Sequence, residues 1–220
     1  MPDHAPSRRA PAHQFDSVAQ QEESAALGMW VFLATEVLFF GGVFLVYAVY
    51  RGWYPEAFSA ASRDLHLALG ATNTVVLIAS SFTMALAVHA AQTGAERPLR
   101  WFLLATILLG TLFLGIKGVE YAGEFAAHRV PGPDFEFEEP YRAQAQIFFS
   151  LYFLMTGLHA LHMIIGLGVL LVVLGMAARR RFSPDYYTPV EMTGLYWHFV
   201  DIVWICLLPL LYLIDRHGGS

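Results

Sequence analysis

Long apolar runs alternate with short polar connections along this chain of 220 residues. Five of the runs are long enough to cross a bilayer as helices, which takes about 20 residues. They occupy residues 27–50, 67–91, 101–122, 146–178 and 194–214. No run alternates apolar and polar positions over about ten residues, as a membrane-spanning strand does. The pattern therefore predicts an all-α protein, a polytopic membrane bundle of five transmembrane helices.

The connections between these runs differ in composition. Residues 51–65 contain Trp53, Tyr54 and Pro55, an aromatic pair and a proline that are typical of a membrane interface followed by a turn. Residues 92–100 are expected to form a tight hairpin. The longest connection, residues 123–145, is rich in proline and acidic residues and is expected to be irregular and solvated.

Both ends of the chain are polar. Residues 1–26 are rich in Ala, Pro, Gln and Glu and lack the early apolar core of a cleavable signal peptide. We expect them to form a flexible tail that the mature protein retains. The transmembrane domain then spans residues 27–214, and residues 215–220 form a short C-terminal tail.

Composition supports a membrane protein. The chain is 56% hydrophobic and 14% charged, whereas soluble domains carry about 25% charged residues. The net charge is -5 and no basic cluster suggests nucleic-acid binding, which argues against nucleic acid as a partner. Cys206 is the single cysteine, so no intrachain disulfide and no cysteine-based metal site is expected.

Orientation follows from the positions of Lys and Arg, which favour the cytoplasmic side. The clearest feature is the triplet Arg179-Arg180-Arg181 at the end of the fourth apolar run. It predicts a cytoplasmic N-terminus and, with five spans, a periplasmic or external C-terminus.

The last apolar run contains His198 and Asp201, flanked by Trp197 and Trp204. A charged residue in the bilayer centre costs at least about 2.5–3.5 kcal/mol and usually has a partner. Positions i and i+3 share a helix face. We therefore expect His198 to reach Asp201.

Glu36 lies about ten residues into the first apolar run. One interpretation is a carboxyl that carries protons. The other is a protonated or hydrogen-bonded acid that fixes helix packing, which we favour because a proton relay needs a chain of such groups.

The third apolar run ends with Lys117 and Glu120, again three residues apart. This spacing predicts a structural ion pair, with the lysine reaching toward the interface. Ser80, Ser81 and Thr83 in the second run are expected to bond to carbonyls of their own helix.

The fourth run contains His159 and His162, followed by Gly166 and Gly168. Small residues allow close helix contact, and histidines can bond across helices. The alternative is a metal or haem site built from both histidines with His198 and Asp201. We favour packing because His-x-x-His alone is a weak signal for a metal.

Several motifs together resemble subunit III of the haem-copper oxidases, the cytochrome c oxidase subunit III family. They are Thr35-Glu36-Val37-Leu38-Phe39-Phe40, Asn73-Thr74, Glu120-Tyr121, Thr156-Gly157-Leu158-His159-Ala160-Leu161-His162 and Trp197-His198-Phe199-Val200-Asp201. The resemblance extends from about residue 25 to 215 in one order, as the five-helix bacterial form has it.

This resemblance implies a non-catalytic core subunit of a bacterial aa3-type cytochrome c oxidase in the plasma membrane. It implies that subunit III binds no redox cofactor of its own and that haem and copper lie in its partners, catalytic subunit I and subunit II. It also implies that the subunit stabilises subunit I, supports proton uptake and holds phospholipid, and that Glu36 matches a carbodiimide-reactive glutamate. The chain lacks two N-terminal helices of the seven-helix form, which build one arm of its lipid cleft.

Other functions remain open at this stage. The five-helix form also occurs in quinol oxidases of the bo type and in a protein associated with nitric oxide reductase. A small transporter or proton channel would use Glu36, Glu120, His159 and Asp201 as its path, although the chain shows no internal repeat. An enzyme with its own metal site is the third possibility.

Overall fold

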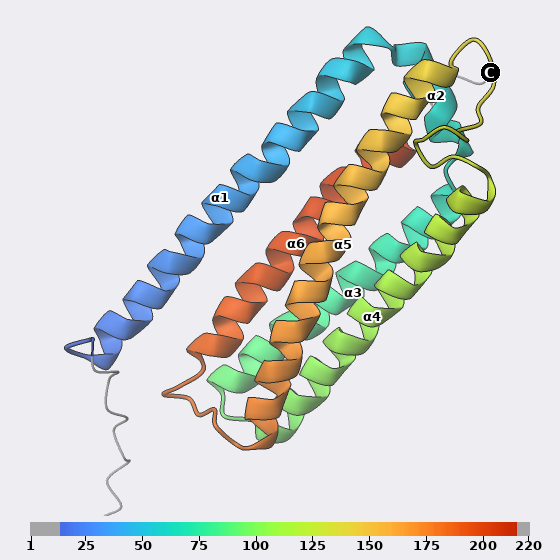
Figure 1. Cartoon of the computed structure of the whole chain (residues 1–220). Coiled ribbons are helices and arrows are strands. Elements are labelled where there is room, and N and C mark those ends of the chain that lie inside the picture. The colour runs from blue at the N-terminus through green and yellow to red at the C-terminus, as the bar shows by residue number, and fades with distance from the viewer. Residues whose placement is uncertain (1–13, 215–220) are drawn as a thin grey trace, which may run out of the picture.

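A computed structural model describes residues 14–214, and six α-helices form most of this part (Figure 1). They are α1 (Val18–Trp53), α2 (Pro55–Asp64), α3 (Leu67–Gln92), α4 (Glu96–Ala126), α5 (Arg142–Ala178) and α6 (Thr188–Tyr212). All except α2 are long and apolar enough to cross a membrane. Within the described residues the single β-type contact is an isolated bridge between Ser183 and Tyr186. The predicted all-α membrane bundle is confirmed.

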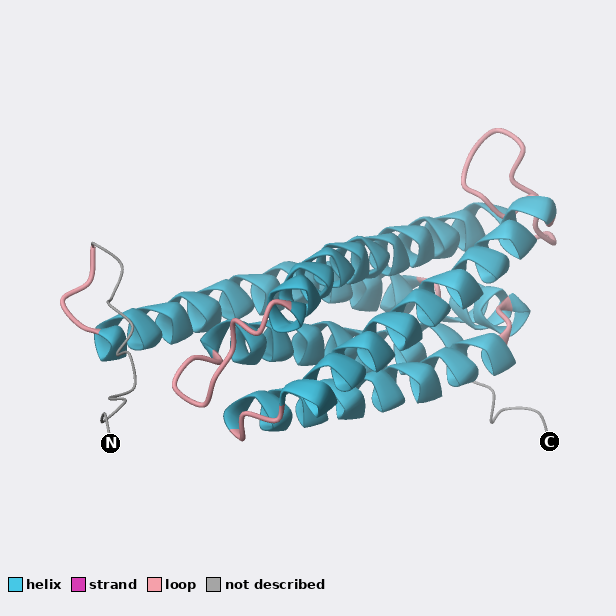
Figure 2. Ribbon diagram, turned by 90° about the horizontal axis from the view of Figure 1, so that it is seen from below, coloured by secondary structure: helices cyan, strands magenta, loops and turns pink. Residues whose placement is uncertain are grey.

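The five long helices run side by side, and the connections lie at the two ends of the bundle (Figures 1 and 2). One end holds the start of α1 and the α3–α4 and α5–α6 connections. The other end holds α2, the α4–α5 connection and the end of α6. Helix α6 contacts α1, α2, α3 and α5 and is the most buried span, whereas α1 is the least buried and lies at the edge.

The buried residues of α1 lie seven residues apart, at Leu33, Phe40 and Tyr47. Residues at this spacing form one narrow line along a helix. Helix α1 therefore packs on the bundle along a single stripe, and most of its apolar side chains face outward.

The helices are longer than the apolar runs that predict them. Helix α1 begins at Val18, where the Ser17 side chain caps it by accepting a hydrogen bond from the Gln20 amide at 3.1 Å. Residues 18–26 are rich in helix formers and are helical, so the expected flexible tail is wrong for this segment. The remaining tail residues at 1–13 and 215–220 lie outside the described residues.

The first connection holds a short helix rather than a turn alone. Pro55 stands at the first position of α2, where its missing N–H costs nothing. The Ser62 hydroxyl donates to the Leu211 carbonyl at 2.7 Å, and the Tyr47 hydroxyl donates to the Leu210 carbonyl. Helices α1 and α2 thus satisfy backbone carbonyls at the end of α6.

The connection at 127–141 is irregular, as predicted, but it is not fully solvated. Phe135 is buried and packs against Phe137 and Phe149. Arg142 donates to the Phe135 carbonyl through Nε at 3.0 Å and Nη2 at 2.7 Å. The connection therefore closes over its end of the bundle, because an apolar side chain anchors it there.

Trp197 of α6 is inserted between α4 and α5. A Cβ atom added at Gly110 or Gly166 would lie 2.8 or 2.9 Å from its ring, closer than real contacts allow. A Cβ added at Gly168 would meet nothing within 4 Å. The close approach predicted at Gly166 is confirmed, and the one predicted at Gly168 is wrong. The close approach at Gly110 has no counterpart in the sequence prediction.

Candidate functional site in the membrane interior

The seven polar residues singled out from the sequence lie in separate parts of the bundle. Glu36 and His162 meet at the edge between α1 and α5. Lys117 and Glu120 lie inside, facing α5 and α6. The remaining three, His159, His198 and Asp201, lie on α5 and α6 among aromatic rings and α3 side chains.

The Glu36–His162 pair joins the edge helix to the bundle. His162 Nε2 lies 3.1 Å from Glu36 Oε2, and the two side chains are 13% and 17% exposed. Phe40 packs edge-on against the imidazole ring at 5.1 Å, and the Tyr196 hydroxyl donates to the His162 carbonyl at 2.9 Å. Both members are therefore held in place and remain reachable from the α1 side.

The other ring nitrogen limits how protons are placed in this pair. His162 Nδ1 lies 2.8 Å from the Leu158 carbonyl, which can only accept, so Nδ1 carries a proton. The 3.1 Å contact to Glu36 then needs one further proton, on the carboxyl or on Nε2. The pair thus has two forms, a neutral acid with a neutral imidazole or a carboxylate with an imidazolium, and both have zero net charge.

Lys117 and Glu120 form the predicted ion pair at 3.1 Å, and both are buried. Lys117 Nζ also donates to the hydroxyls of Tyr152 at 3.1 Å and Tyr212 at 3.0 Å. These two hydroxyls donate in turn to Glu120 Oε1. Every ammonium proton has an acceptor, which is the condition for a stable buried ion pair.

This cluster corrects the expected position of the lysine. Lys117 does not reach toward the interface, because its ammonium lies over the rings of Tyr152 at 4.9 Å and Trp204 at 5.3 Å. Cation–π contacts and hydroxyl acceptors replace water around the charge. The cluster therefore ties α4 to α5 and α6.

His198 does not pair with Asp201, which corrects the sequence prediction. Its Nδ1 lies 2.7 Å from the Ser81 hydroxyl of α3, and Ser81 also approaches the Asp201 carboxyl. Within the described residues neither Asp201 oxygen makes a hydrogen bond of normal geometry. The two side chains of α6 are thus connected through α3, because the i, i+3 spacing allows contact without requiring it.

The serines of α3 bond across the bundle more than along their own helix. The Ser80 hydroxyl accepts from Trp197 Nε1 at 3.0 Å and donates to the Thr106 carbonyl at 3.5 Å. Thr83 alone makes the expected bond to its own helix, at the Ser80 carbonyl. The expectation for Ser80 and Ser81 is therefore wrong.

His159 is buried between aromatic rings. Phe113 and Trp204 lie 5.3 and 5.2 Å from its ring, and neither ring nitrogen has a hydrogen-bond partner among the described residues. Between residues 14 and 214, no group of three or more His, Cys, Asp or Glu side chains is placed to hold a metal ion. The histidines and Asp201 thus do not converge on a common centre.

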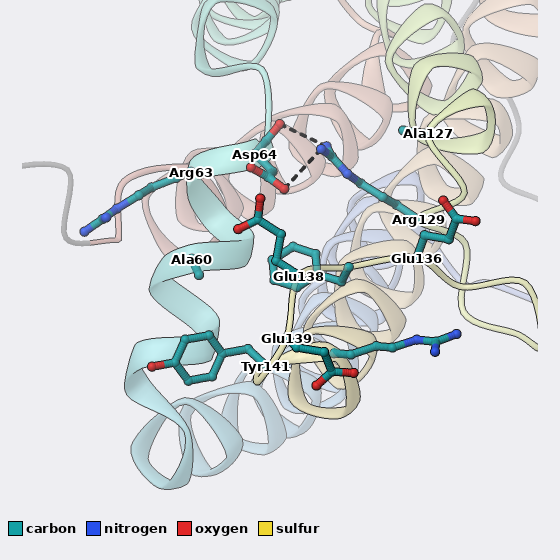
Figure 3. Close-up of a pocket in the computed structure, with 11 residues that line it drawn as sticks. Ala60, Arg63, Asp64, Ala127, Arg129, Glu136, Glu138, Glu139 and Tyr141 are labelled. Atoms are coloured by element: carbon teal, nitrogen blue, oxygen red, sulfur yellow. Dashed lines mark hydrogen bonds and ion pairs between the residues drawn. The ribbon is translucent and has the colours of Figure 1, made fainter.

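A wide pocket opens at the α2 end of the bundle, with a volume of about 930 Å³. Figure 3 shows Arg129 reaching Asp64 across it, at 3.0 Å between Nη2 and Oδ2. Arg129 also contacts Glu124, and the Tyr141 hydroxyl donates to Glu56 at 2.7 Å. These contacts join α2 and α4 to the α4–α5 connection.

The fold and the interior together define a multi-pass helical membrane protein in which several buried polar residues bond across helices. The model of the family described as cytochrome c oxidase subunit III matches residues 12–215. The chain belongs to the cytochrome c oxidase subunit III family, whose members are membrane proteins of the respiratory chain. Membership in this family implies association with other oxidase subunits.

Individual relatives agree with the family. The chain is 32% identical to cytochrome c oxidase subunit 3 of Thermostichus vulcanus over 205 residues, 91% of this chain and 92% of the relative. It is 34% identical to that of Corynebacterium diphtheriae over 193 residues, with 86% and 88% covered. For Papio hamadryas the identity is 31% over 215 residues, 93% of this chain and 75% of the relative.

Proposed function

We propose that this chain is subunit III of a bacterial aa3-type cytochrome c oxidase, in the plasma membrane with its N-terminus in the cytoplasm. It stabilises catalytic subunit I, lies in a complex with subunit II, and supports proton uptake by the core. Haem and copper are held by those partners. The relatives named as cytochrome c oxidase subunits support cytochrome c rather than quinol as the electron donor.

The Glu36–His162 pair is the observation that carries the proton-uptake part of this proposal. Its single shared proton can pass between carboxyl and imidazole without a change in net charge, so the transfer does not create an isolated charge in the membrane. Both side chains are partly exposed at the α1 edge. A proton can therefore be exchanged there with a neighbouring subunit.

The outward face of α1 supports the choice of partner. Val37, Leu38 and Phe39 follow Glu36 directly and are 59%, 76% and 46% exposed. Helix α1 touches its own bundle along one stripe only, so a second membrane protein can pack on the rest. In membranes such packing rests on close contact and on polar groups between helices. We place subunit I on this face.

The deciding experiment is oxygen consumption by the purified oxidase core, followed over many turnovers with and without this chain. The core alone should reduce oxygen at first and then lose activity, because electron transfer does not pass through this chain while proton uptake slows. A complex with Glu36→Gln should lie between the two time courses.

Two outcomes contradict the proposal. Immediate and complete loss of activity with an intact haem spectrum would place the chain in the chemistry itself. Identical time courses with and without the chain would show that proton uptake does not need it.

A further inference from the structure

Helix α6 has one side that no other helix of the described chain covers. Helix α6 contacts both α1 and α3, yet those two helices make no contact with each other. Between them α6 presents Ile202 and Ile205, which are 58% and 47% exposed, together with the exposed Cys206 and the half-buried His198. Positions i, i+4 and i+7 share one helix face, so His198, Ile202 and Ile205 form a line along it. We call this surface the open side of α6.

Two neighbouring residues of α6 mark the flanks of the open side. His198 Nδ1 lies 2.7 Å from the Ser81 hydroxyl of α3. The next residue, Phe199, packs edge-on against Phe40 of α1, with 6.2 Å between the ring centroids. The open side therefore lies between α3 on one flank and α1 on the other.

His198 brings a polar atom to the open side. Its Nδ1 is bonded to Ser81, whereas its Nε2 makes no hydrogen bond within the described part of the chain. Ser81 lies near the middle of α3, a helix that is long enough to cross the membrane. His198 is thus at the depth of the lipid chains, where neither water nor lipid head groups are at hand. Nε2 therefore requires a polar partner from protein.

Pro209 frees a second polar atom on the same side. Proline has no N–H, so the Ile205 carbonyl loses the donor that bonds to it in a regular helix. This carbonyl lies between two exposed residues, Ile205 and Pro209. Because Ile205 follows His198 by seven residues, the two polar positions are about 10 Å apart along α6.

The two polar atoms define what can bind here. Lipid chains offer neither a donor nor an acceptor, whereas side chains of another membrane helix offer both. In a neutral imidazole Nε2 donates or accepts, according to whether Ser81 gives its proton to Nδ1. A hydroxyl or a side-chain amide can answer either form, and each can donate to the Ile205 carbonyl. The fitting helix therefore carries Ser, Thr, Asn or Gln opposite His198 and Ile205.

We propose that the open side of α6 binds a transmembrane helix of another protein, whose hydroxyl or amide side chains bond to His198 and to the Ile205 carbonyl. This surface is separate from the outward face of α1 at Val37, Leu38 and Phe39, on which we place subunit I. The inference therefore goes beyond the proposed function, and its failure would leave that function untouched.

The test places a photoreactive benzoylphenylalanine at Ile202 of the full chain in native membranes. Illumination joins this label to a neighbouring C–H group, and mass spectrometry identifies the joined peptide. We expect a membrane-spanning segment that contains Ser, Thr, Asn or Gln. The same label at Val119, which is 67% exposed on α4, is the control and should join mostly lipid. A label at Leu38 reports the α1 face separately.

Matched variants test the polar contacts. His198→Leu should lower the yield of the Ile202 product about fivefold, and His198→Gln should restore most of it. Ser81→Ala removes the same bond inside the chain but leaves Nε2 in place, so it should keep most of the yield unless the loss comes from misfolding. Pro209→Ala returns a donor to the Ile205 carbonyl and favours the helix, yet it should lower the yield about twofold.

Four results would overturn the proposal. The label at Ile202 could join lipid alone, as at Val119. It could join a second copy of this chain, which indicates self-association. The joined segment could lack any hydroxyl or amide side chain. The yield could be the same for His198→Leu, His198→Gln and the wild type, which would show that the imidazole holds no partner.

Discussion

Buried polar residues of this protein differ in how far their hydrogen bonds are satisfied. Each proton of the Lys117 ammonium has an acceptor. The amide of Asn73 and the carboxyl of Asp201 are buried, yet within the described residues they make no hydrogen bond of normal geometry. A satisfied network fixes side-chain positions, so it should be the most sensitive to loss of one member.

Lys117→Met should lower the free energy of unfolding by about 3–5 kcal/mol, because it leaves Glu120 buried without its counter-ion. Lys117→Met combined with Glu120→Gln removes both charges and should recover at least half of that loss. Unfolding of the purified chain by SDS in mixed micelles measures both. If the double variant were less stable than Lys117→Met alone, the two charges would not be coupled.

Glu36 should react with a hydrophobic carbodiimide at neutral pH, since this reagent enters lipid and needs a protonated carboxyl. The neutral form of the Glu36–His162 pair supplies one. Glu120 is the internal control, because it is buried and its carboxyl oxygens are bonded to Lys117, Tyr152 and Tyr212, so it should stay unmodified. Peptide mapping that finds Glu120 labelled and Glu36 unlabelled would contradict both assignments.

At this scale the sequence predicts contacts within a helix better than contacts between helices. The spacing of Lys117 and Glu120 correctly predicts their pairing. The same spacing wrongly predicts a contact of His198 with Asp201, because the His198 ring bonds to Ser81 of another helix instead. Tyr152 and Tyr212 complete the cluster around Lys117, and no motif in the sequence indicates this. Both lie far from Lys117 along the chain, and that separation carries no information about which helices pack together.

At the scale of elements, the apolar runs predict which segments form long helices. They do not predict where these helices end or which helices they contact. The five predicted spans are all present. Helix α2 was not expected, because its composition is that of a connection and its burial depends on the end of α6. Trp197 fits between α4 and α5 only because Gly110 and Gly166 leave room for its ring.

Gly166→Ala should therefore destabilise the bundle by about 1–3 kcal/mol, since the new methyl group overlaps the Trp197 ring. Gly168→Ala is the matched control on the same helix and should be neutral or slightly stabilising, because it meets nothing and alanine favours a helix. Thermal unfolding of both variants in one detergent compares them. Equal losses would show that helix propensity, and not the ring, sets the effect.

At the scale of the whole molecule, the two ends of the described chain differ in how their arginines are grouped and paired. The end that holds the start of α1 carries Arg97, Arg100 and the triplet Arg179-Arg180-Arg181. At the other end the acidic connection faces α2, and Arg129 is paired with Asp64 and Glu124. Cytoplasmic connections are enriched in Lys and Arg, so this asymmetry favours the α1 start as the cytoplasmic end.

Reporter fusions should therefore place the connection at 179–187 in the cytoplasm and the C-terminus on the opposite side. Five spans require the two termini to lie on opposite sides, and the arginine triplet sets the direction. A fusion in the connection at 127–141 should report the same compartment as a fusion at Ser220. Replacing the triplet with glutamine should lower the fraction of chains in this orientation, because it removes the strongest local signal. A single compartment for the fusions at 179–187 and Ser220 would exclude five spans, and a full reversal of both would exclude a cytoplasmic N-terminus.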